Sequence, residues 1–379
     1  MRTTPYNIVI LGAGGIGRAV GLLLAEYADF SCEIHIGDRY RSVAEDAASW
    51  VIENSHASAV ASFWVDDAFS GDELTRVIGQ SDVVLDCLPG SVAPQVAALA
   101  LKHSKHYVNL TEHVDATEQI VDLAKSASST FILQTGLAPG FVNVLGYKMF
   151  ADFCSSNGVE VVDFVGLKVG ALTQNGFFPH YYGYTWSPIG VATEYVRDVN
   201  IIKDYRKQSV PSLSECESII IGGELYECDF TSGGAADMPQ VLEGRTRRLN
   251  YKTIRYPGHY NWVRCILANA PEGVSKADYL DAEMRKTVPV VEEDMVVVYV
   301  TIKGNDSSGV LRQVDRSLKI KPTKVGNTTL RAIQATTAAA MAECARLIIG
   351  GMPSGVILQH QVDPNSFLDG PFVSRIYFG

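Results

Sequence analysis

Over about the first 140 residues, short apolar runs alternate with longer stretches in which apolar residues recur at helical spacing. The runs that predict β-strands are residues 6–12, 32–38, 57–65, 82–89, 106–111 and 130–136. The stretches that predict helices are residues 15–27, 42–54, 72–79, 92–103 and 115–126. Strands that alternate with helices in this way predict an α/β domain with a doubly wound parallel sheet.

The pattern changes after about residue 158. Segment 159–172 is too long and too rich in β-branched residues for a helix. Segment 218–230 predicts a hairpin that turns at Gly222-Gly223, and segment 294–320 predicts a second hairpin with a looser turn. The middle of the chain is therefore expected to be a mixed or antiparallel sheet. From residue 327 an alanine-rich helix follows, which could pack back on the first domain.

Composition and charge narrow the class of partner. The chain has 379 residues, enough for about two domains. Lys plus Arg is 32 and Asp plus Glu is 42, which gives a net charge of −10, with no basic tract. Nucleic acid and anionic membrane surfaces are therefore not expected as partners. No uninterrupted apolar run is long enough to span a bilayer.

The seven cysteines contain no C-x-x-C pair, and the first residues lead straight into a predicted strand, so no leader sequence is expected. We expect free thiols, no metal site and a cytoplasmic protein.

A glycine pattern follows the first predicted strand. "GAGGIG" places Gly12, Gly14 and Gly17 in G-x-G-x-x-G spacing at the start of a predicted helix. This pattern predicts a turn that brings backbone N–H groups to a pyrophosphate. Asp38 ends the next strand, where a carboxylate binds the adenosine ribose and disfavours a 2′-phosphate. Arg39 could instead accommodate that phosphate, so NAD is the expected cofactor and NADP remains possible.

Ligands of doubly wound sheets bind at the carboxyl ends of the strands, where three stretches carry candidate residues. They are Asp86, Cys87 and Pro89 in "LDCLPG", Glu112 and His113 in "NLTEH", and Gly136, Pro139, Gly140 and Asn143 in "QTGLAPGFVN". Each has a structural alternative: Cys87 as an inert apolar residue, Asp86 as a helix cap, and Glu112 and His113 as ordinary loop residues.

The stretch "YKTIRYPGHYNW", residues 251–262, places Arg255 and His259 on either side of a Pro-Gly turn among aromatic residues. A strand is expected to end at this turn. Arg255 could form a buried salt bridge, and His259 could be a hydrogen-bonded core residue. A second aromatic loop, with Tyr184, Trp186 and Ser187, is either a lid or a dimer contact.

Several of these segments resemble the saccharopine dehydrogenase family, which includes NADP-linked saccharopine reductase and NAD-linked lysine 6-dehydrogenase. The resemblance rests on the "GAGGIG" loop, the "GLAPG" turn, "YTWSPIGVATEY" and above all "YKTIRYPGH". It implies a Rossmann domain formed by residues 1–142 and 328–379. It also implies an inserted α+β domain of mixed sheet, residues 143–327, that binds substrate and forms a homodimer.

The resemblance also implies an activity: NAD(P)-dependent oxidation or reduction of the CH–NH group of an amino acid, of the saccharopine/lysine 6-dehydrogenase type. Hydride would pass between the substrate carbon and C4 of the nicotinamide, by way of an imine. A carboxynorspermidine or opine-like reductive condensation and a non-catalytic dinucleotide-binding sensor remain alternatives.

The resemblance gives the candidate residues three roles. Arg255, Tyr184, Trp186, Ser187 and Asn143 would bind substrate, and the acid–base candidates are Glu112, His113 and His259. The cofactor would contact Gly12, Gly14, Gly15, Ile16, Gly17, Asp38, Arg39, Cys87, Leu88, Pro89, Gly136, Pro139 and Gly140.

Overall fold

The computed structural model describes residues 4–56, 59–112 and 114–379. The chain forms two compact units. The first contains Met1–Phe141, Thr323–Leu330 and Gln334–Gly379, and the second contains Val142–Pro322 and Arg331–Ile333.

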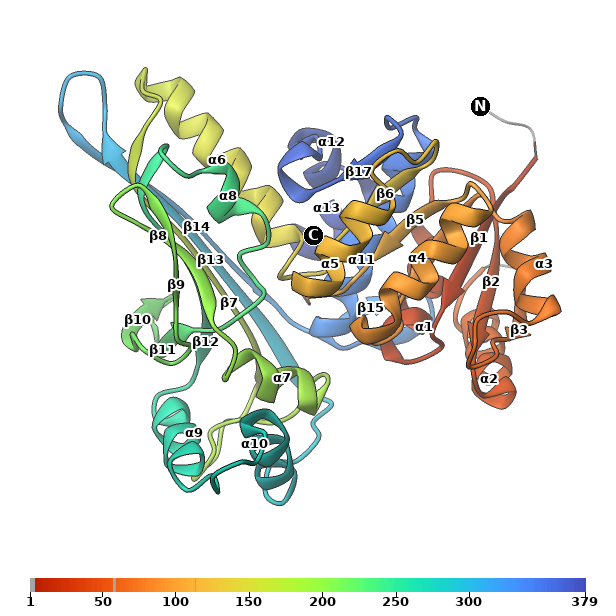
Figure 1. Ribbon diagram of the computed structural model, residues 1–379, viewed down its shortest axis with the longest axis horizontal. Coiled ribbons are helices and arrows are strands. Elements are labelled where there is room, and N and C mark those ends of the chain that lie inside the picture. Colours follow the sequence, from red (N-terminus) through yellow and green to blue (C-terminus); the bar gives the residue numbers. More distant parts are fainter. Residues whose placement is uncertain (1–3, 57–58, 113) are drawn as a thin grey trace. The chain divides into compact units, whose positions relative to one another are not determined.

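The first unit is a seven-stranded sheet in the order β17-β6-β5-β4-β1-β2-β3, in which every pairing is parallel. Helices lie on both of its faces (Figure 1). The strands are β1 (Tyr6–Leu11), β2 (Cys32–Asp38), β3 (Val60–Trp64), β4 (Val83–Asp86), β5 (His106–Asn109), β6 (Thr130–Ile132) and β17 (Gly355–Ile357). The helices are α1 (Gly15–Tyr27), α2 (Arg41–Asn54), α3 (Asp72–Gln80), α4 (Ala93–Lys102), α5 (Val114–Leu123), α11 (Ala332–Ile349), α12 (Pro364–Leu368) and α13 (Pro371–Tyr377).

This confirms the doubly wound parallel sheet. The chain runs outward from β1 in one direction through β2 and β3, and in the other through β4, β5 and β6. The order therefore reverses between β1 and β4, and a ligand of such a sheet binds at this point of reversal. Strand β17, which the sequence did not predict, extends the sheet beyond β6.

A buried acid on α11 holds the start of α13, the last helix of the first unit. The Glu343 carboxylate is fully buried, accepts hydrogen bonds from the N–H groups of Phe372 and Val373 and forms an ion pair with Arg346. It thereby caps α13, whose first residues leave unpaired N–H groups. A Cβ at Gly370 would lie 2.0 Å from a Glu343 oxygen, so only glycine fits there.

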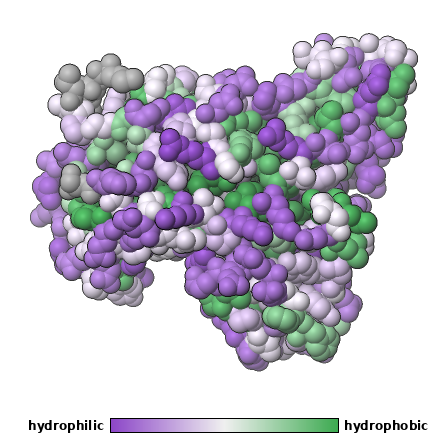
Figure 2. Space-filling model, turned by 180° about the vertical axis from the view of Figure 1, so that it is seen from behind, coloured by the Kyte–Doolittle hydropathy of each residue, from purple (hydrophilic) through white to green (hydrophobic). Residues whose placement is uncertain are grey.

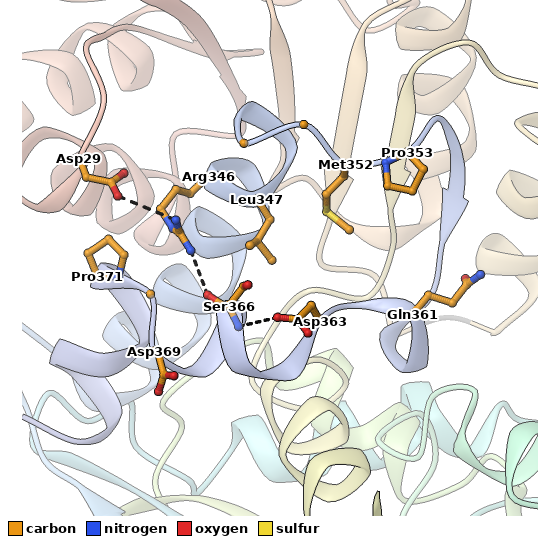
Figure 3. A pocket seen from close by; sticks show the side chains of 13 residues that line it. Asp29, Arg346, Leu347, Met352, Pro353, Gln361, Asp363, Ser366, Asp369 and Pro371 are labelled. Atoms are coloured by element: carbon orange, nitrogen blue, oxygen red, sulfur yellow. Dashed lines mark hydrogen bonds and ion pairs between the residues drawn. The ribbon is translucent and has the colours of Figure 1, made fainter. Parts of the chain in front are cut away.

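Arg346 also borders a hollow of about 700 Å³ in the first unit (Figure 3). Its Nη2 donates to the Ser366 carbonyl at 2.9 Å, and Asp29 lies 3.8 Å from its Nη1. Asp363 accepts from the Ser366 N–H at 2.7 Å and so caps α12. None of the residues predicted to bind cofactor lines this hollow.

The second unit is built on an eight-stranded mixed sheet with the path β10-β11-β12-β7-β13-β14. Outside this path, β8 pairs with β12, and β9 pairs with β8. Its strands are β7 (Val162–Thr173), β8 (Val199–Lys203), β9 (Arg206–Val210), β10 (Glu217–Ile221), β11 (Glu224–Phe230), β12 (Thr246–Arg255), β13 (Asp294–Asn305) and β14 (Leu311–Ile320). Its helices are α6 (Phe141–Asn157), α7 (Pro188–Glu194), α8 (Met238–Val241), α9 (His259–Ala268) and α10 (Lys276–Arg285).

The two predicted hairpins are confirmed. Strands β10 and β11 turn at Gly222 and Gly223, whose φ angles of 58° and 84° suit glycine, and β13 pairs with β14 along ten residue pairs. The hairpin of β8 and β9 was not predicted, because its second strand is almost wholly exposed and polar. In the described part of the chain, no helix is both long enough and apolar enough to cross a membrane.

Candidate active site

The glycine loop between β1 and α1 has the geometry that a bound pyrophosphate needs. Gly12 has φ +99°, and a Cβ there would lie 2.9 Å from the Cys87 carbonyl oxygen. A Cβ at Gly17 would lie 1.8 Å from the Gly12 carbonyl oxygen, so α1 packs against β1 only with glycine. A Cβ at Gly14 meets no atom within 4 Å. The loop is therefore tight at its first and third glycines and open at its second, where a phosphate approaches the backbone.

Asp38 lies at the end of β2, beside this loop. Its carboxylate accepts hydrogen bonds from the Ala13 N–H and the Tyr40 N–H, both at 3.0 Å. Arg39 is exposed, and its Nε lies 3.7 Å from an Asp67 carboxylate oxygen. Asp38 is thus held against the turn where a ribose would lie, whereas the Arg39 side chain projects toward solvent.

The loop after β4 packs on the glycine turn. The Cys87 N–H donates to the Leu11 carbonyl at 2.8 Å, and the Leu88 side chain lies 3.3 Å from the Cβ position of Gly12. Pro89 is exposed and precedes a short 3-10 helix. Burial, and secondarily the Asp86 charge, raises the pKa of the Cys87 thiol, so Cys87 is an apolar contact rather than a nucleophile.

Asp86 itself is buried, and its main partner, Tyr107, lies 21 residues away in the chain. Its Oδ2 accepts from the Tyr107 hydroxyl at 2.7 Å and its Oδ1 from the Leu88 N–H at 3.0 Å. Burial raises the pKa of Asp86 to about 7, against the opposing hydrogen bonds. A carboxyl group that titrates near neutral pH therefore supports the loop beside the cofactor turn.

The "GLAPG" segment is a tight turn that opens α6, as predicted. Gly140 has φ +133°, and a Cβ there would lie 2.0 Å from the Gly136 carbonyl oxygen. That same oxygen accepts from the Phe141 N–H at 2.9 Å. Pro139 is buried within this turn. Gly140 is therefore required by the backbone geometry itself, whereas a Cβ at Gly136 would lie 3.2 Å from the Pro139 carbonyl oxygen, a tight contact.

The acid–base candidates of the first unit stay predictions. Glu112 is half-buried in the loop after β5. His113 lies outside the described residues. Among the residues that the structure does describe, no three His, Cys, Asp or Glu side chains form a group suited to a metal ion.

In the second unit, Arg255 is the last residue of β12 and is only 1% exposed. Its Nε donates to the Tyr195 hydroxyl at 2.6 Å and its Nη1 to the Ile254 carbonyl at 2.9 Å. The guanidinium carbon lies 4.8 Å from the Tyr182 ring centroid. None of the carboxylates in the described ranges forms an ion pair with it, although the Glu194 charge favours its charged form, and its side-chain hydrogen bonds there are those of Nε and Nη1. Arg255 is thus a buried cation that no anion among the described residues pairs with.

The sheet register explains this missing pair. Glu227 lies directly opposite Arg255 on β11, where an ion pair would be expected. Its carboxylate instead accepts from the Gly258 N–H at 3.0 Å and the Tyr260 N–H at 2.7 Å. These N–H groups begin α9, and a carboxylate at a helix N-terminus is favoured by the helix dipole. The nearest acid by register is therefore committed to α9.

The Pro-Gly turn of the "YPGH" segment connects β12 to α9. Gly258 has φ +101°, and a Cβ there would lie 2.8 Å from the Tyr181 ring. The turn places His259 at the first position of α9, fully buried. Its Nδ1 lies 2.7 Å from the His180 carbonyl oxygen and its Nε2 lies 2.9 Å from the Tyr195 hydroxyl. Burial, and next the Arg255 charge, lowers the pKa of His259 to about 3.

The other predicted substrate residues lie on several elements of this unit. Tyr184 and Thr185 are buried, and their hydroxyl groups have no hydrogen-bond partner in the part of the chain described. Trp186 is half-buried, and Ser187 is exposed and caps α7 by accepting from the Gly190 N–H. Asn143, fully buried on α6, donates to the Gly234 carbonyl at 3.0 Å. Buried hydroxyl groups of this kind need a hydrogen-bond partner, which is an ordered water molecule or a polar ligand.

Comparison with known proteins shows which family has this architecture. The family model for the saccharopine dehydrogenase NADP-binding domain matches residues 8–132, and the model for the saccharopine dehydrogenase C-terminal domain matches residues 136–373. The chain belongs to the saccharopine dehydrogenase family. The resemblance seen in the sequence is thereby confirmed, and so is a dehydrogenase fold that uses NAD(P).

Individual relatives are distant. The chain is 27% identical to alpha-aminoadipic semialdehyde synthase of Arabidopsis thaliana over 203 residues, which is 50% of this chain and 19% of that protein. The alignment thus spans about a fifth of that relative's length.

Two solved structures share the fold over nearly the whole chain. Apo saccharopine dehydrogenase (L-Glu forming) from Saccharomyces cerevisiae has a TM-score of 0.77 at 16% identity and covers 98% of both chains. The homospermidine synthase of Legionella pneumophila in complex with NAD has a TM-score of 0.66 at 14% identity and covers 99% of this chain and 90% of its own.

Three residues of the site were not singled out from the sequence. Tyr195, Glu227 and Tyr107 lie far along the chain from their partners, which are Arg255, the first N–H groups of α9 and Asp86, respectively. A tyrosine or glutamate inside a strand or helix carries no local motif, so only the fold reveals these contacts.

Proposed function

We propose that this protein is an NAD(P)-dependent oxidoreductase acting on the CH–NH group of an amino acid, and that Arg255 binds the α-carboxylate. The supporting observation is that Arg255 is buried without an ion-pair partner among the described residues. A buried charge is costly unless an opposite charge meets it. A substrate carboxylate supplies that charge, and an arginine fork binds carboxylates through two N–H groups.

The proposed reaction has two stages, an oxidation to an imine and a hydrolysis of that imine. The substrate amine would lose a proton to a base, and the adjacent carbon would lose the hydride that a bound NAD(P) accepts, which would leave a C=N bond. Water adds to this bond, and the adduct separates into an amine and a carbonyl compound. Glu112 and His113 remain the candidates for the base, because the low pKa of His259 makes that imidazole a weak proton acceptor at neutral pH.

We further propose NAD as the preferred cofactor. The Asp38 carboxylate is held against the glycine turn, where it would accept hydrogen bonds from ribose hydroxyl groups and repel a 2′-phosphate. Bound there, the dinucleotide supplies or accepts the hydride.

A polyamine-type substrate is the second candidate, because the fold is shared with a homospermidine synthase. Arg255 argues against a simple polyamine, which carries positive charge and no carboxylate. A reductive condensation whose product is a carboxylated polyamine would still use Arg255.

The test follows absorbance at 340 nm. Protein with NAD or NADP is given L-lysine, saccharopine, ornithine, glutamate and polyamines, and the reverse mixtures receive NADH or NADPH. We expect turnover with an amino acid and NAD. Turnover with a polyamine that has no carboxyl group would contradict the proposal, and so would no turnover across the panel by protein that binds NADH.

We also propose a homodimer through the mixed sheet. Strand β14 is an edge strand, and all of its residues except Ile320 are at least partly exposed. Hydrophobic side chains also reach the surface at hairpin β10–β11, where Ile220 is 70% exposed (Figure 2). Edge strands left open in this way pair with another chain. Light scattering after size-exclusion chromatography should give twice the mass of 41.2 kDa, and a monomer would contradict the proposal.

A further inference from the structure

The hydrogen bonds around Arg255 have only one consistent set of directions. A carbonyl oxygen can only accept, so His259 Nδ1 carries the proton that meets the His180 carbonyl at 2.7 Å. The imidazole is neutral at neutral pH, because burial and the Arg255 charge lower its pKa. Its Nε2 is therefore an acceptor, and the Tyr195 hydroxyl donates to it at 2.9 Å. Tyr195 in turn accepts from Arg255 Nε at 2.6 Å.

This arrangement fixes the guanidinium from one side. Tyr195 and the Ile254 carbonyl occupy Nε and one N–H of Nη1, and the Tyr182 ring lies over the guanidinium carbon. The donors that remain are those of Nη2 and the second N–H of Nη1. Two donors on adjacent nitrogens of one planar group form the fork that binds a carboxylate.

We propose that Tyr195 and His259 are positioning residues that orient the free edge of Arg255 for the substrate carboxylate. His259 acts through Tyr195. Its Nε2 accepts a hydrogen bond from the Tyr195 hydroxyl, and this orients the lone pairs of the Tyr195 oxygen toward Arg255. This inference rests on the proposed role of Arg255 and assigns to His259 a role other than proton transfer to substrate.

The test compares two buried tyrosines of the same cluster. Tyr195→Phe removes the hydroxyl that contacts Arg255. Tyr260→Phe is the matched control, because Tyr260 is equally buried, its ring lies 5.8 Å from that of Tyr195, and its hydroxyl bonds only the Thr253 carbonyl. Loss of one hydrogen bond to a charged group corresponds to roughly a tenfold change or more.

We expect Tyr195→Phe to raise KM for the amino-acid substrate about tenfold, while kcat changes less than KM. Tyr260→Phe should leave both constants near those of the wild type. His259→Leu should resemble Tyr195→Phe, and His259→Gln, whose amide oxygen can still accept, should restore part of the affinity. NADH binding, followed by fluorescence, and the midpoint of urea unfolding should be unchanged in all four variants, which shows that both units are folded.

Two failures are distinguishable. If Arg255→Ala raises KM but the two tyrosine variants behave alike, the positioning role is wrong and the carboxylate site stands. If Arg255→Ala leaves KM unchanged, the carboxylate site itself is wrong. A fall in kcat of His259→Gln equal to that of His259→Leu, with KM unchanged, would show that His259 transfers protons and would overturn the inference.

Discussion

The candidate site of the first unit is formed by backbone groups, whereas that of the second unit is formed by side chains. The cofactor turn of the first unit is shaped by backbone, with Gly12 and Gly17 packed where no side chain fits and Gly14 left open. The site of the second unit is made of side chains, with Arg255 on β12, Tyr195 after α7 and His259 on α9. A backbone site is local in sequence, whereas a side-chain site exists only after distant segments have packed together.

The two sites also treat charge differently. At the cofactor turn, Asp38 accepts hydrogen bonds from backbone N–H groups. In the second unit, Arg255 is buried with no paired anion in the described part of the chain. The charge of the first site is thus met by hydrogen bonds, whereas none of the described carboxylates lies at ion-pair distance from the charge of the second. The second unit is therefore expected to have a lower free energy of unfolding than its packing alone would give.

The largest expected effect comes from a comparison of two arginines of the second unit, Arg264 and Arg255. Arg264 pairs with Asp229, whose side chain is fully buried, and Arg255 pairs with no carboxylate among the described residues. Arg264→Met should lower the free energy of unfolding, by less than about 3 kcal/mol because Arg264 is 38% exposed and Asp229 keeps hydrogen bonds from the Glu215 and Phe230 N–H groups. Arg255→Met should leave that free energy unchanged or raise it by up to about 2 kcal/mol. Equal losses in urea unfolding would show that Arg255 is a structural residue.

The next effect tests the backbone site. Gly17→Ala places a Cβ 1.8 Å from the Gly12 carbonyl, so we expect a loss of at least about 2 kcal/mol of stability and of measurable NADH binding. Gly14→Ala is the control, because nothing lies within 4 Å of its Cβ. It should keep the wild-type stability and weaken only NADH binding. Equal stability of both variants would contradict this description of the turn.

A third effect depends on pH and comes from Asp86. Its folded-state pKa of about 7 exceeds the ordinary value of 3.8, so the folded protein holds the proton more tightly than the unfolded chain. The free energy of unfolding should therefore fall as pH rises from about 4 to 7, by up to about 1.4 kcal/mol per pH unit, and then level off.

Asp86→Asn removes this contribution. Relative to the wild type, the variant should be more stable at pH 8 than at pH 5, as measured by urea unfolding at several pH values. Parallel curves for the two proteins would mean that Asp86 does not titrate in this range.

The smallest effect concerns cofactor choice. Asp38→Asn removes the carboxylate beside the ribose position and should move the ratio of NADP to NAD affinity about tenfold toward NADP, which corresponds to about 1.4 kcal/mol. Arg39→Ala is the control and should change the ratio less, because its side chain is exposed. A larger shift in the Arg39 variant would assign the choice to Arg39.

The sequence predicted what is periodic or local. Alternating strands and helices, the glycine turn, Asp38 after β2 and the Gly222-Gly223 hairpin are all confirmed, because each depends on neighbours a few residues apart. It did not predict β17, which joins the sheet through β6 some 220 residues earlier in the chain, from Gly355 back to Thr130. It also could not show that Glu227, opposite Arg255, caps α9. The charge state of a site depends on such long-range contacts.

The most direct test of the central claim compares two substrates that differ by one carboxyl group. We would measure kcat/KM for L-lysine and for cadaverine, with NAD, in the wild type and in Arg255→Met. The account predicts that the wild type prefers lysine by a large factor and that the variant loses most of this preference through its activity on lysine alone. A variant that slows both substrates equally, or that keeps the preference for lysine, would show that Arg255 does not bind the substrate carboxylate.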